Sequence, residues 1–154
     1  MSDRPSFVYV TYINTSAEKL WTALTDGKFT REYWGGRAIA SDWKVGSEVR
    51  LTKQNGADDG ARINVLEIDP PAKLVLSWRS GFQPTGPATR VTFTIQPAGP
   101  KNVKLTVVHE EYEPGSMVHD MLREGWSAIL SSLKTFLETG EALDVTRRWA
   151  ETGN

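Results

Sequence analysis

Hydrophobic and polar residues alternate with two different periods along the chain, and the changes of period separate its predicted elements. The first run, Phe7–Ile13, is β-branched and aromatic throughout, which predicts a strand. Thr15 or Ser16 can then cap a helix whose apolar residues recur at spacings of three and four until Gly27 stops it. A second short helical stretch covers about residues 28–33. One strand followed by two short helices is therefore expected at the start of the chain.

From Ala38 to Tyr112 the period shortens to two, which is typical of strands with one buried face. Turn-forming residues, mainly glycine and proline, separate the runs. The predicted strands are Arg37–Ser41, Glu48–Gln54, Arg62–Asp69, Lys73–Arg79, Thr89–Gln96 and Val103–Tyr112. This alternation predicts an antiparallel meander with one buried face and one solvated face.

The last strong pattern is helical. Over residues 117–137 apolar side chains recur at spacings of three and four, with polar side chains on the opposite face. The helix is expected to begin near residues 114–116 and to end at Thr139–Gly140, where glycine suits a left-handed cap. Its roughly six turns would measure about 30–35 Å. Residues 141–154 are expected as a tail, either loose or with a short helix around Leu143–Trp149.

This order of elements limits the architecture. A single curved sheet with one apolar face needs a cover, and only the long last helix is large enough to supply it. We therefore expect an α+β helix-grip fold, in which a curved antiparallel sheet of six to seven strands wraps around a long C-terminal helix. Two short helices follow the first strand. The 154 residues suit a single domain with its core at about residues 7–139.

Composition removes several classes of function. The chain has no cysteine, which excludes disulfides, thiolate nucleophiles and cysteine-ligated metals. Its net charge of −1 provides no broad basic surface for nucleic acid. No run approaches the roughly 18 apolar residues of a membrane span, and the first residues do not resemble a secretory signal, so a cytoplasmic location is expected. Two histidines without regular spacing predict no metal site, and the absence of phosphate-binding and dinucleotide-binding motifs predicts no cofactor.

Three segments resemble one known family. They are Trp34-Gly35-Gly36, the segment 65–78 with its Ile68-Asp69-Pro70-Pro71 turn, and Gly125-Trp126 in the last helix. In this order they resemble the START-like superfamily and, within it, the homologues of the activator of the heat-shock-protein-90 ATPase, over about residues 7–137. The resemblance implies a deep apolar cavity between the sheet and the C-terminal helix. Members of the superfamily use it to hold lipids, sterols, polyketides or other hydrophobic small molecules.

The residues expected to line this cavity lie on the inner face of the sheet and on the helices that cover it. They are Tyr33, Trp34, Arg50, Trp78, Val107, His109, Met121 and Trp126. Arg50 belongs to this set only if Glu48, Arg50 and Thr52 face inward, and the opposite register is equally allowed. Four of the six tryptophans fall on elements that would enclose the cavity, which accounts for the high aromatic content.

Three functions fit these predictions. The first, which we expect, is non-catalytic binding of a hydrophobic or aromatic small molecule in the cavity, because no catalytic motif is present. The second is polyketide cyclase/dehydratase-like or hydrolase chemistry with His109 and Glu111 as acid and base, since both continue the inward series of one strand. The third is a protein-interaction role like that of the cochaperone, in which the tail around Val145 and Trp149 docks on a partner or on a second copy as a homodimer.

Overall fold

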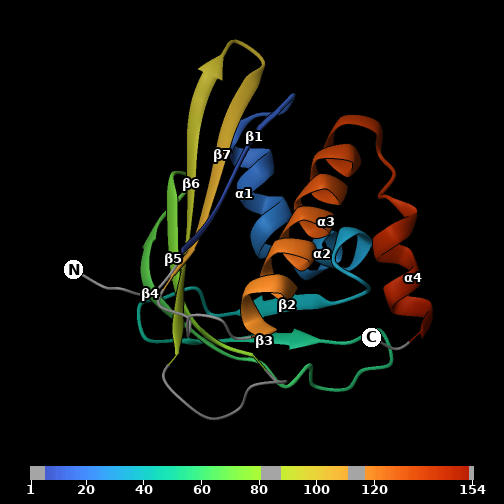
Figure 1. Cartoon of the computed structure of the whole chain (residues 1–154). Helices are drawn as coiled ribbons and strands as arrows, with labels where there is room; N and C mark the ends of the chain where they lie inside the picture. The colour runs from blue at the N-terminus through green and yellow to red at the C-terminus, as the bar shows by residue number, and fades with distance from the viewer. Residues whose placement is uncertain (1–5, 81–87, 111–116, 153–154) are drawn as a thin grey trace.

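The computed structural model describes residues 6–80, 88–110 and 117–152, with the backbone alone over 117–123 and at 150 and 152. In this part of the chain seven strands form one antiparallel sheet with the order β1-β7-β6-β5-β4-β3-β2 (Figure 1). The strands are β1 (Ser6–Ile13), β2 (Ala38–Ser41), β3 (Glu48–Thr52), β4 (Arg62–Asp69), β5 (Lys73–Arg79), β6 (Thr89–Gly99) and β7 (Asn102–Glu110). The helices are α1 (Ala17–Thr25), α2 (Gly27–Tyr33), α3 (Met117–Thr139) and α4 (Asp144–Thr152). The predicted α+β helix-grip class is confirmed.

The two short helices carry the chain from one edge of the sheet to the other. Ser16 caps α1, because its hydroxyl accepts a hydrogen bond of 3.2 Å from a main-chain N–H of the first turn. Asp26 caps α2 in the same way, over 2.9 Å. Gly27 opens α2 directly against β2, where a Cβ would lie 2.7 Å from the carbonyl oxygen of Ile39. Only glycine allows this close approach.

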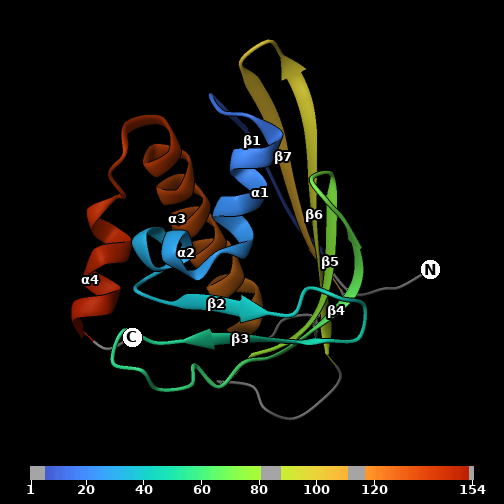
Figure 2. The same cartoon turned by 180° about the vertical axis from the view of Figure 1, so that it is seen from behind.

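The inner face of the sheet and one side of α3 form the core (Figure 2). Alternate residues of the two long strands are buried: Val91, Phe93, Ile95, Val103, Leu105 and Val107. From α3 the buried apolar residues include Trp126, Ile129, Leu130 and Leu133. The period-two and helical patterns of the sequence therefore predicted which residues face each other.

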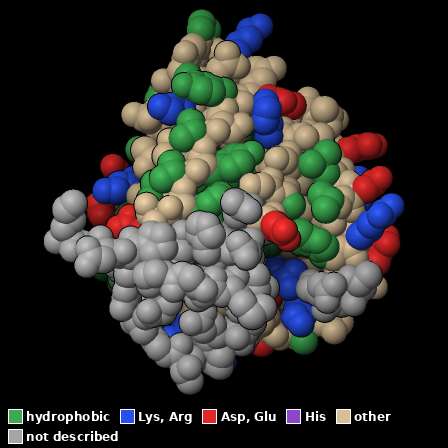
Figure 3. Space-filling model, in the orientation of Figure 1, with side chains coloured by type: hydrophobic (Ala, Val, Ile, Leu, Met, Phe, Trp, Pro, Cys, Tyr) green, Lys and Arg blue, Asp and Glu red, His purple; other side chains and the backbone are tan. Residues whose placement is uncertain are grey.

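Some large hydrophobic side chains stay on the surface. Among the described residues they are Val8, Val10, Tyr12, Val45, Leu66 and Val145. Three of them belong to β1, which is an edge strand of the sheet. Figure 3 shows hydrophobic side chains gathered over β1 and β7 on this side of the molecule.

The tail packs on its own chain as α4. Thr146 is fully buried, and its hydroxyl lies 2.9 Å from that of Ser132 in α3. A Cβ on Gly35 would lie 3.3 Å from the Cβ of Trp149, so the glycine permits this contact between α4 and the turn after α2. Trp149 therefore covers part of its own chain, and docking of the tail on a partner stays a prediction. Val145, the other apolar residue of the tail, stays 44% exposed.

β1, β2 and β7 each begin one residue away from their predicted start, and two strands differ from the predictions at their C-terminal ends. β3 ends at Thr52 rather than at residue 54, because the Lys53 N–H bonds to the carbonyl of Ala57 over 2.7 Å and turns the chain. β6 continues to Gly99, three residues beyond its predicted end. The predicted end of the last strand, at residues 111–112, lies outside the described residues.

Candidate functional site

Three tryptophan side chains from different elements meet between the sheet and α3. The rings of Trp34, after α2, and Trp78, in β5, are stacked with centroids 6.1 Å apart and planes 7° apart. The ring of Trp126, in α3, meets both edge-on, at 5.6 Å from Trp34 and 5.9 Å from Trp78. Phe93 and His109 complete the group, with centroids 5.9 and 6.2 Å from that of Trp126. We call these five rings the aromatic cluster.

Local structure places the first two tryptophans. The N–H of Trp34 closes α2 by donating to the carbonyl of Thr30 over 2.8 Å. Gly35 and Gly36 then have φ of +57° and +78°, a left-handed conformation that glycine adopts easily, and the chain turns away into β2. Trp78 follows two buried leucines at alternate positions of β5, so it points to the same inner face.

The surroundings of the cluster are apolar. Trp34, Trp78 and Trp126 are only 6%, 8% and 4% exposed, so the three residues are almost completely buried. Within the described side chains, none of the buried residues is Asp, Glu, Lys or Arg. A charged group brought into the cluster would therefore lose its hydration without gaining an ionic partner there.

His109 belongs to a directed chain of hydrogen bonds at one end of the cluster. Trp126 Nε1 donates to His109 Nδ1 over 3.0 Å, because an indole N–H can only donate. The proton of the neutral imidazole then lies on Nε2, which is 2.7 Å from the Thr89 hydroxyl oxygen. That hydroxyl donates in turn to the carbonyl of Trp78 over 2.7 Å. The chain of donors ends on a backbone acceptor.

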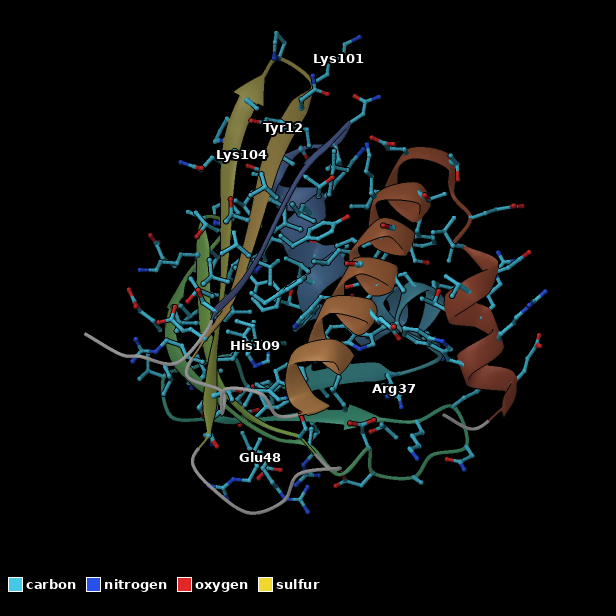
Figure 4. The ribbon with its side chains drawn as sticks, in the orientation of Figure 1. Tyr12, Arg37, Glu48, Lys101, Lys104 and His109 are labelled. Atoms are coloured by element: carbon cyan, nitrogen blue, oxygen red, sulfur yellow. The ribbon has the colours of Figure 1, made fainter. Side chains whose placement is uncertain are left out.

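Burial controls the ionisation of His109. The residue is 1% exposed, and burial lowers its pKa from 6.5 to about 4. At neutral pH the imidazole is therefore uncharged. Its Nδ1 lone pair accepts from Trp126 and its Nε2 proton is held by Thr89, so the geometry suits a side chain that positions others better than one that transfers a proton. Figure 4 shows His109 near the end of the sheet, facing α3.

Tyr33 lies behind the cluster. Its hydroxyl donates to the carbonyl of Ala23 in α1 over 2.8 Å, and its ring lies 6.3 Å from Trp34 and 6.5 Å from Phe136. The side chain is fully buried, and burial raises the pKa of the phenol far above its ordinary value. Tyr33 therefore joins α1, α2 and α3 and packs beside Trp34.

Arg50 does not face the cluster, so the expectation that it lines the site is wrong. Val49 and Leu51 are buried on the inner face, and Val49 is paired with the equally buried Ile63 of β4. This register turns Glu48 and Arg50 to the outside, where they form an exposed ion pair of 3.3 Å. Figure 4 shows Glu48 away from α3.

The other predicted site residues divide into three groups. Trp34, Trp78, His109 and Trp126 come together in the cluster. Val107 is fully buried and opposite Phe93 in the sheet. The side chain of Met121 and all of Glu111 lie outside the described residues.

Two members of the site were missed by the sequence interpretation. Thr89 starts β6 opposite Trp78, and Phe93 continues the inward series of that strand. The alternation of β6 was visible and could have identified Phe93. Thr89 could not be found in this way, because its role depends on the pairing of β5, β6 and β7.

Two hollows lined by described residues lie away from the aromatic cluster. One of about 440 Å³ lies between α2, the end of β3 and α4, and is lined by charged residues such as Arg31, Lys53 and Glu151. Another of about 340 Å³ lies on the outer face of the sheet beside Val75. Between the sheet and α3, the described rings of the cluster lie against one another, and the cavity expected there stays a prediction.

The described residues give no sign of a metal or a membrane segment. They contain no group of three or more His, Asp or Glu side chains placed to hold a metal ion. None of the helices in this part of the chain has the length and apolar content to cross a bilayer.

Comparison with known proteins agrees with the fold. The model of the family described as "Activator of Hsp90 ATPase homolog 1-like protein" matches residues 14–138. No curated protein matches the chain. An HSP90 activator from Plasmodium falciparum has a TM-score of 0.74 and 22% identity, covering 86% of this chain and 96% of its own. The Aha1 dimer from Colwellia psychrerythraea has a TM-score of 0.75 and 20% identity, covering 90% and 99%.

A third solved structure is a protein of the dynemicin biosynthetic locus. It has a TM-score of 0.70 and 21% identity, covering 89% of this chain and 48% of that one. At these identities the three likenesses show a shared fold.

Proposed function

Because this chain belongs to the family of activator of Hsp90 ATPase homologue 1-like proteins, we propose that it binds an uncharged, flat aromatic or hydrophobic small molecule against its aromatic cluster. The observation that carries the proposal is the meeting of three indoles from α2, β5 and α3 in one place. Indoles offer large apolar faces and edges, and each pair of aromatic rings contributes about 0.5–1.5 kcal/mol beyond its buried area. A flat guest would extend the existing stack by packing against the rings of the cluster.

The chemistry of the cluster limits the guest. Its polar groups are the neutral imidazole of His109 and the hydroxyl of Thr89, and the described buried side chains include no charge. A carboxylate or ammonium on the buried part of a ligand would have no ionic partner among them, whereas a phenol or carbonyl could exchange one neutral hydrogen bond. The proposed ligand is therefore an uncharged aromatic compound with few polar groups.

The proposal is binding without catalysis. The hydrogen-bond chain from Trp126 through His109 and Thr89 ends on the carbonyl of Trp78, so every proton in it already has an acceptor. A general base at this position would have to break the bond from Trp126 to expose its lone pair. The lowered pKa of His109 also makes the imidazole a weak base at neutral pH.

The names of three structural neighbours support different partners. A protein of a biosynthetic locus agrees with a small-molecule guest. An HSP90 activator instead favours contact with a chaperone, which is the competing proposal. The dimer described for the Colwellia protein supports association of this chain with a second copy.

Tryptophan fluorescence tests the proposed binding. Quercetin, an anthraquinone and palmitate, titrated separately into the protein, represent a flat polar aromatic, a flat apolar aromatic and an aliphatic acid. We expect at least one aromatic compound to quench the fluorescence and raise Tm, and palmitate to bind more weakly because of its charge. Trp78→Phe should weaken the binding several-fold, whereas Trp21→Phe, a half-buried tryptophan of α1 outside the cluster, should not.

Two results would reject the small-molecule proposal. One is that no compound changes fluorescence or Tm. The other is that Trp21→Phe and Trp78→Phe reduce binding equally. Stimulation of an Hsp90 ATPase by the ligand-free protein, in the absence of ligand binding, would favour the chaperone alternative.

A further inference from the structure

The larger of the two hollows lies between α2, the start of β2, the end of β3 and α4. Its volume of about 440 Å³ is typical of small-molecule sites. Figure 2 shows the start of β2 and the end of β3 reaching the side of the molecule where α2 and α4 lie. The rings of the aromatic cluster do not line this hollow, so it is a separate place in the fold.

Charged side chains dominate the lining of the hollow. Five of the eight residues that line it are charged, and they come from three separate segments of the chain. The cations are Arg31 on α2, Lys53 after β3 and Arg147 on α4, and the anions are Glu32 on α2 and Glu151 on α4. The hollow therefore brings together both signs of charge.

These charges do not neutralise one another. Among the described residues, no ion pair joins any two of the five side chains. Arg147 and Glu151 are four apart on one helix, a spacing that allows pairing, yet Arg147 contacts Asp144 instead, over 4.0 Å. Lys53 is half-buried, and its ammonium group has no carboxylate partner within the described part of the chain. The lining thus keeps unused capacity for ionic contacts.

A neighbouring arginine shows the contrast. Arg37 stands in the chain between Gly36 and Ala38, two small residues that line the hollow. Its guanidinium pairs with the carboxylate of Asp59, and the two side chains are only 15% and 17% exposed. The charge of Arg37 is therefore already compensated, whereas the charges that line the hollow are not.

We propose that this hollow binds a small zwitterion that carries a phosphate or carboxylate at one end and an ammonium group at the other. A purely anionic molecule would meet Glu32 and Glu151, and a purely cationic one would meet three positive side chains. A molecule with both signs of charge can satisfy both sets. Small side chains at positions 36 and 38 leave room for it.

Each charged group has a part in the proposed contacts. Arg31, Lys53 and Arg147 donate to the oxygens of the anionic group, and such charge-assisted hydrogen bonds are roughly twice as strong as neutral ones. The planar fork of a guanidinium suits two oxygens of one phosphate or carboxylate. Glu32 and Glu151 accept from the ammonium group. The ligand thereby links α4 to α2 and to the end of β3.

The site should be weak and sensitive to salt. Four of its five charged residues are exposed, and only Lys53 is half-buried. Salt screens attraction between exposed charges, so the affinity should fall as sodium chloride is added. We expect a dissociation constant of about 1 mM for a small probe. Because the aromatic cluster lies elsewhere, this proposal and the proposed function can fail separately.

Isothermal titration calorimetry at neutral pH and constant ionic strength tests the proposal. The probes are phosphoethanolamine, which is a zwitterion, inorganic phosphate, which is an anion, and ethanolamine, which is a cation. Phosphoethanolamine should bind most tightly, phosphate several-fold more weakly, and ethanolamine should give no measurable binding. No binding of phosphoethanolamine, or equal binding of all three probes, would overturn the proposal.

Two substitutions separate the roles of the cations and the anions. Lys53→Gln should weaken the binding of phosphoethanolamine and of phosphate alike, by about fivefold or more. Glu32→Gln should weaken phosphoethanolamine but strengthen phosphate, because it removes a partner of the ammonium and a repulsion from the anion. Lys19→Gln is the matched control, since Lys19 is exposed on α1 and does not line the hollow.

The opposite effects of Glu32→Gln on the two probes distinguish a contact with the ligand from a loss of folding, which would weaken both. Circular dichroism and Tm should show that all three variants are folded. Binding by Lys53→Gln that equals the wild type, or an equal loss in Lys19→Gln, would overturn the site. An unchanged ratio of the two affinities in Glu32→Gln would overturn its preference for a zwitterion.

Discussion

The indole Nε1 of Trp126 donates a hydrogen bond of 3.0 Å to Nδ1 of His109, which joins α3 to the end of β7. Both side chains are nearly inaccessible, at 4% and 1% exposure. Because Nδ1 of His109 accepts this bond, the imidazole proton lies on Nε2. Nε2–H then donates to the Thr89 hydroxyl, which in turn donates to the carbonyl of Trp78. The attachment of α3 to the sheet and the hydrogen bonds of the aromatic cluster therefore both depend on this contact.

Loss of this contact should destabilise the fold. Trp126→Phe removes the donor and leaves Nδ1 of His109 buried without it, which costs about 1–3 kcal/mol in addition to lost packing. We expect a decrease of about 2–4 kcal/mol in the free energy of unfolding, measured with urea. Trp21→Phe, outside the cluster, should cost clearly less. Equal losses in the two variants would contradict the role assigned to the bond.

The hydroxyl group of Thr89 should contribute more to the stability of the fold than the shape of its side chain does. Thr89→Val keeps the volume but removes the acceptor for His109 Nε2–H and the donor to the Trp78 carbonyl. We expect a loss of about 1–3 kcal/mol in unfolding free energy. Thr89→Ser keeps the hydroxyl and should retain most of the stability. If the valine variant is as stable as the serine variant, the proposed hydrogen-bond chain is wrong.

Stability should fall in mild acid because of His109. Its pKa is about 4 in the folded protein and about 6.5 when unfolded, so the unfolded state binds more protons between these values. The contribution is fully present above about pH 6.5 and is lost as pH falls toward about 4, by on the order of 3 kcal/mol. Urea unfolding of the wild type and His109→Asn at several pH values measures this difference.

The difference between the two unfolding free energies should shrink steadily over that pH window. Subtracting the variant removes the contributions of all other titrating groups that the two proteins share. A difference that stays constant from neutral pH to pH 4 would show that His109 does not titrate as the burial predicts.

The C-terminal tail should contribute to stability rather than to association. Removal of residues 141–154 exposes Ser132 and Gly35, which Thr146 and Trp149 cover in the intact chain. We expect a clear decrease in Tm, because the tail covers these residues in the intact chain. Val145→Lys should change stability by less than about 0.5 kcal/mol, as for most exposed positions. Loss of association without loss of Tm would assign the tail to an interface.

The sequence predicted the parts of this structure that follow from local periodicity. The cap at Ser16, the inward series of Val91, Phe93 and Ile95, and the apolar stripe that includes Trp126 all depend on residues close in the chain. Their order was sufficient to predict the helix-grip fold and four of the residues that meet in the cluster. Local pattern carries this information because each face of an element must be buried or solvated as a whole.

Features that depend on pairing between distant segments were not predictable. The outward position of Arg50 follows from the register of Val49 with Ile63, and a one-residue shift would have reversed it. Thr89 reaches His109 only because β6 lies between β5 and β7. The packing of Trp149 on Gly35 joins residues more than a hundred positions apart. The sequence interpretation had no local signal for any of the three.

The most direct test of the central claim uses the six indole N–H resonances in a ¹H–¹⁵N correlation spectrum, each assigned by a single Trp→Phe variant. During titration with the aromatic compound that quenches fluorescence, the account predicts that Trp34, Trp78 and Trp126 shift together with one dissociation constant. Trp21, Trp43 and Trp149 should stay in place. Shifts confined to those three, or no shifts at all at saturating ligand, would contradict binding at the aromatic cluster.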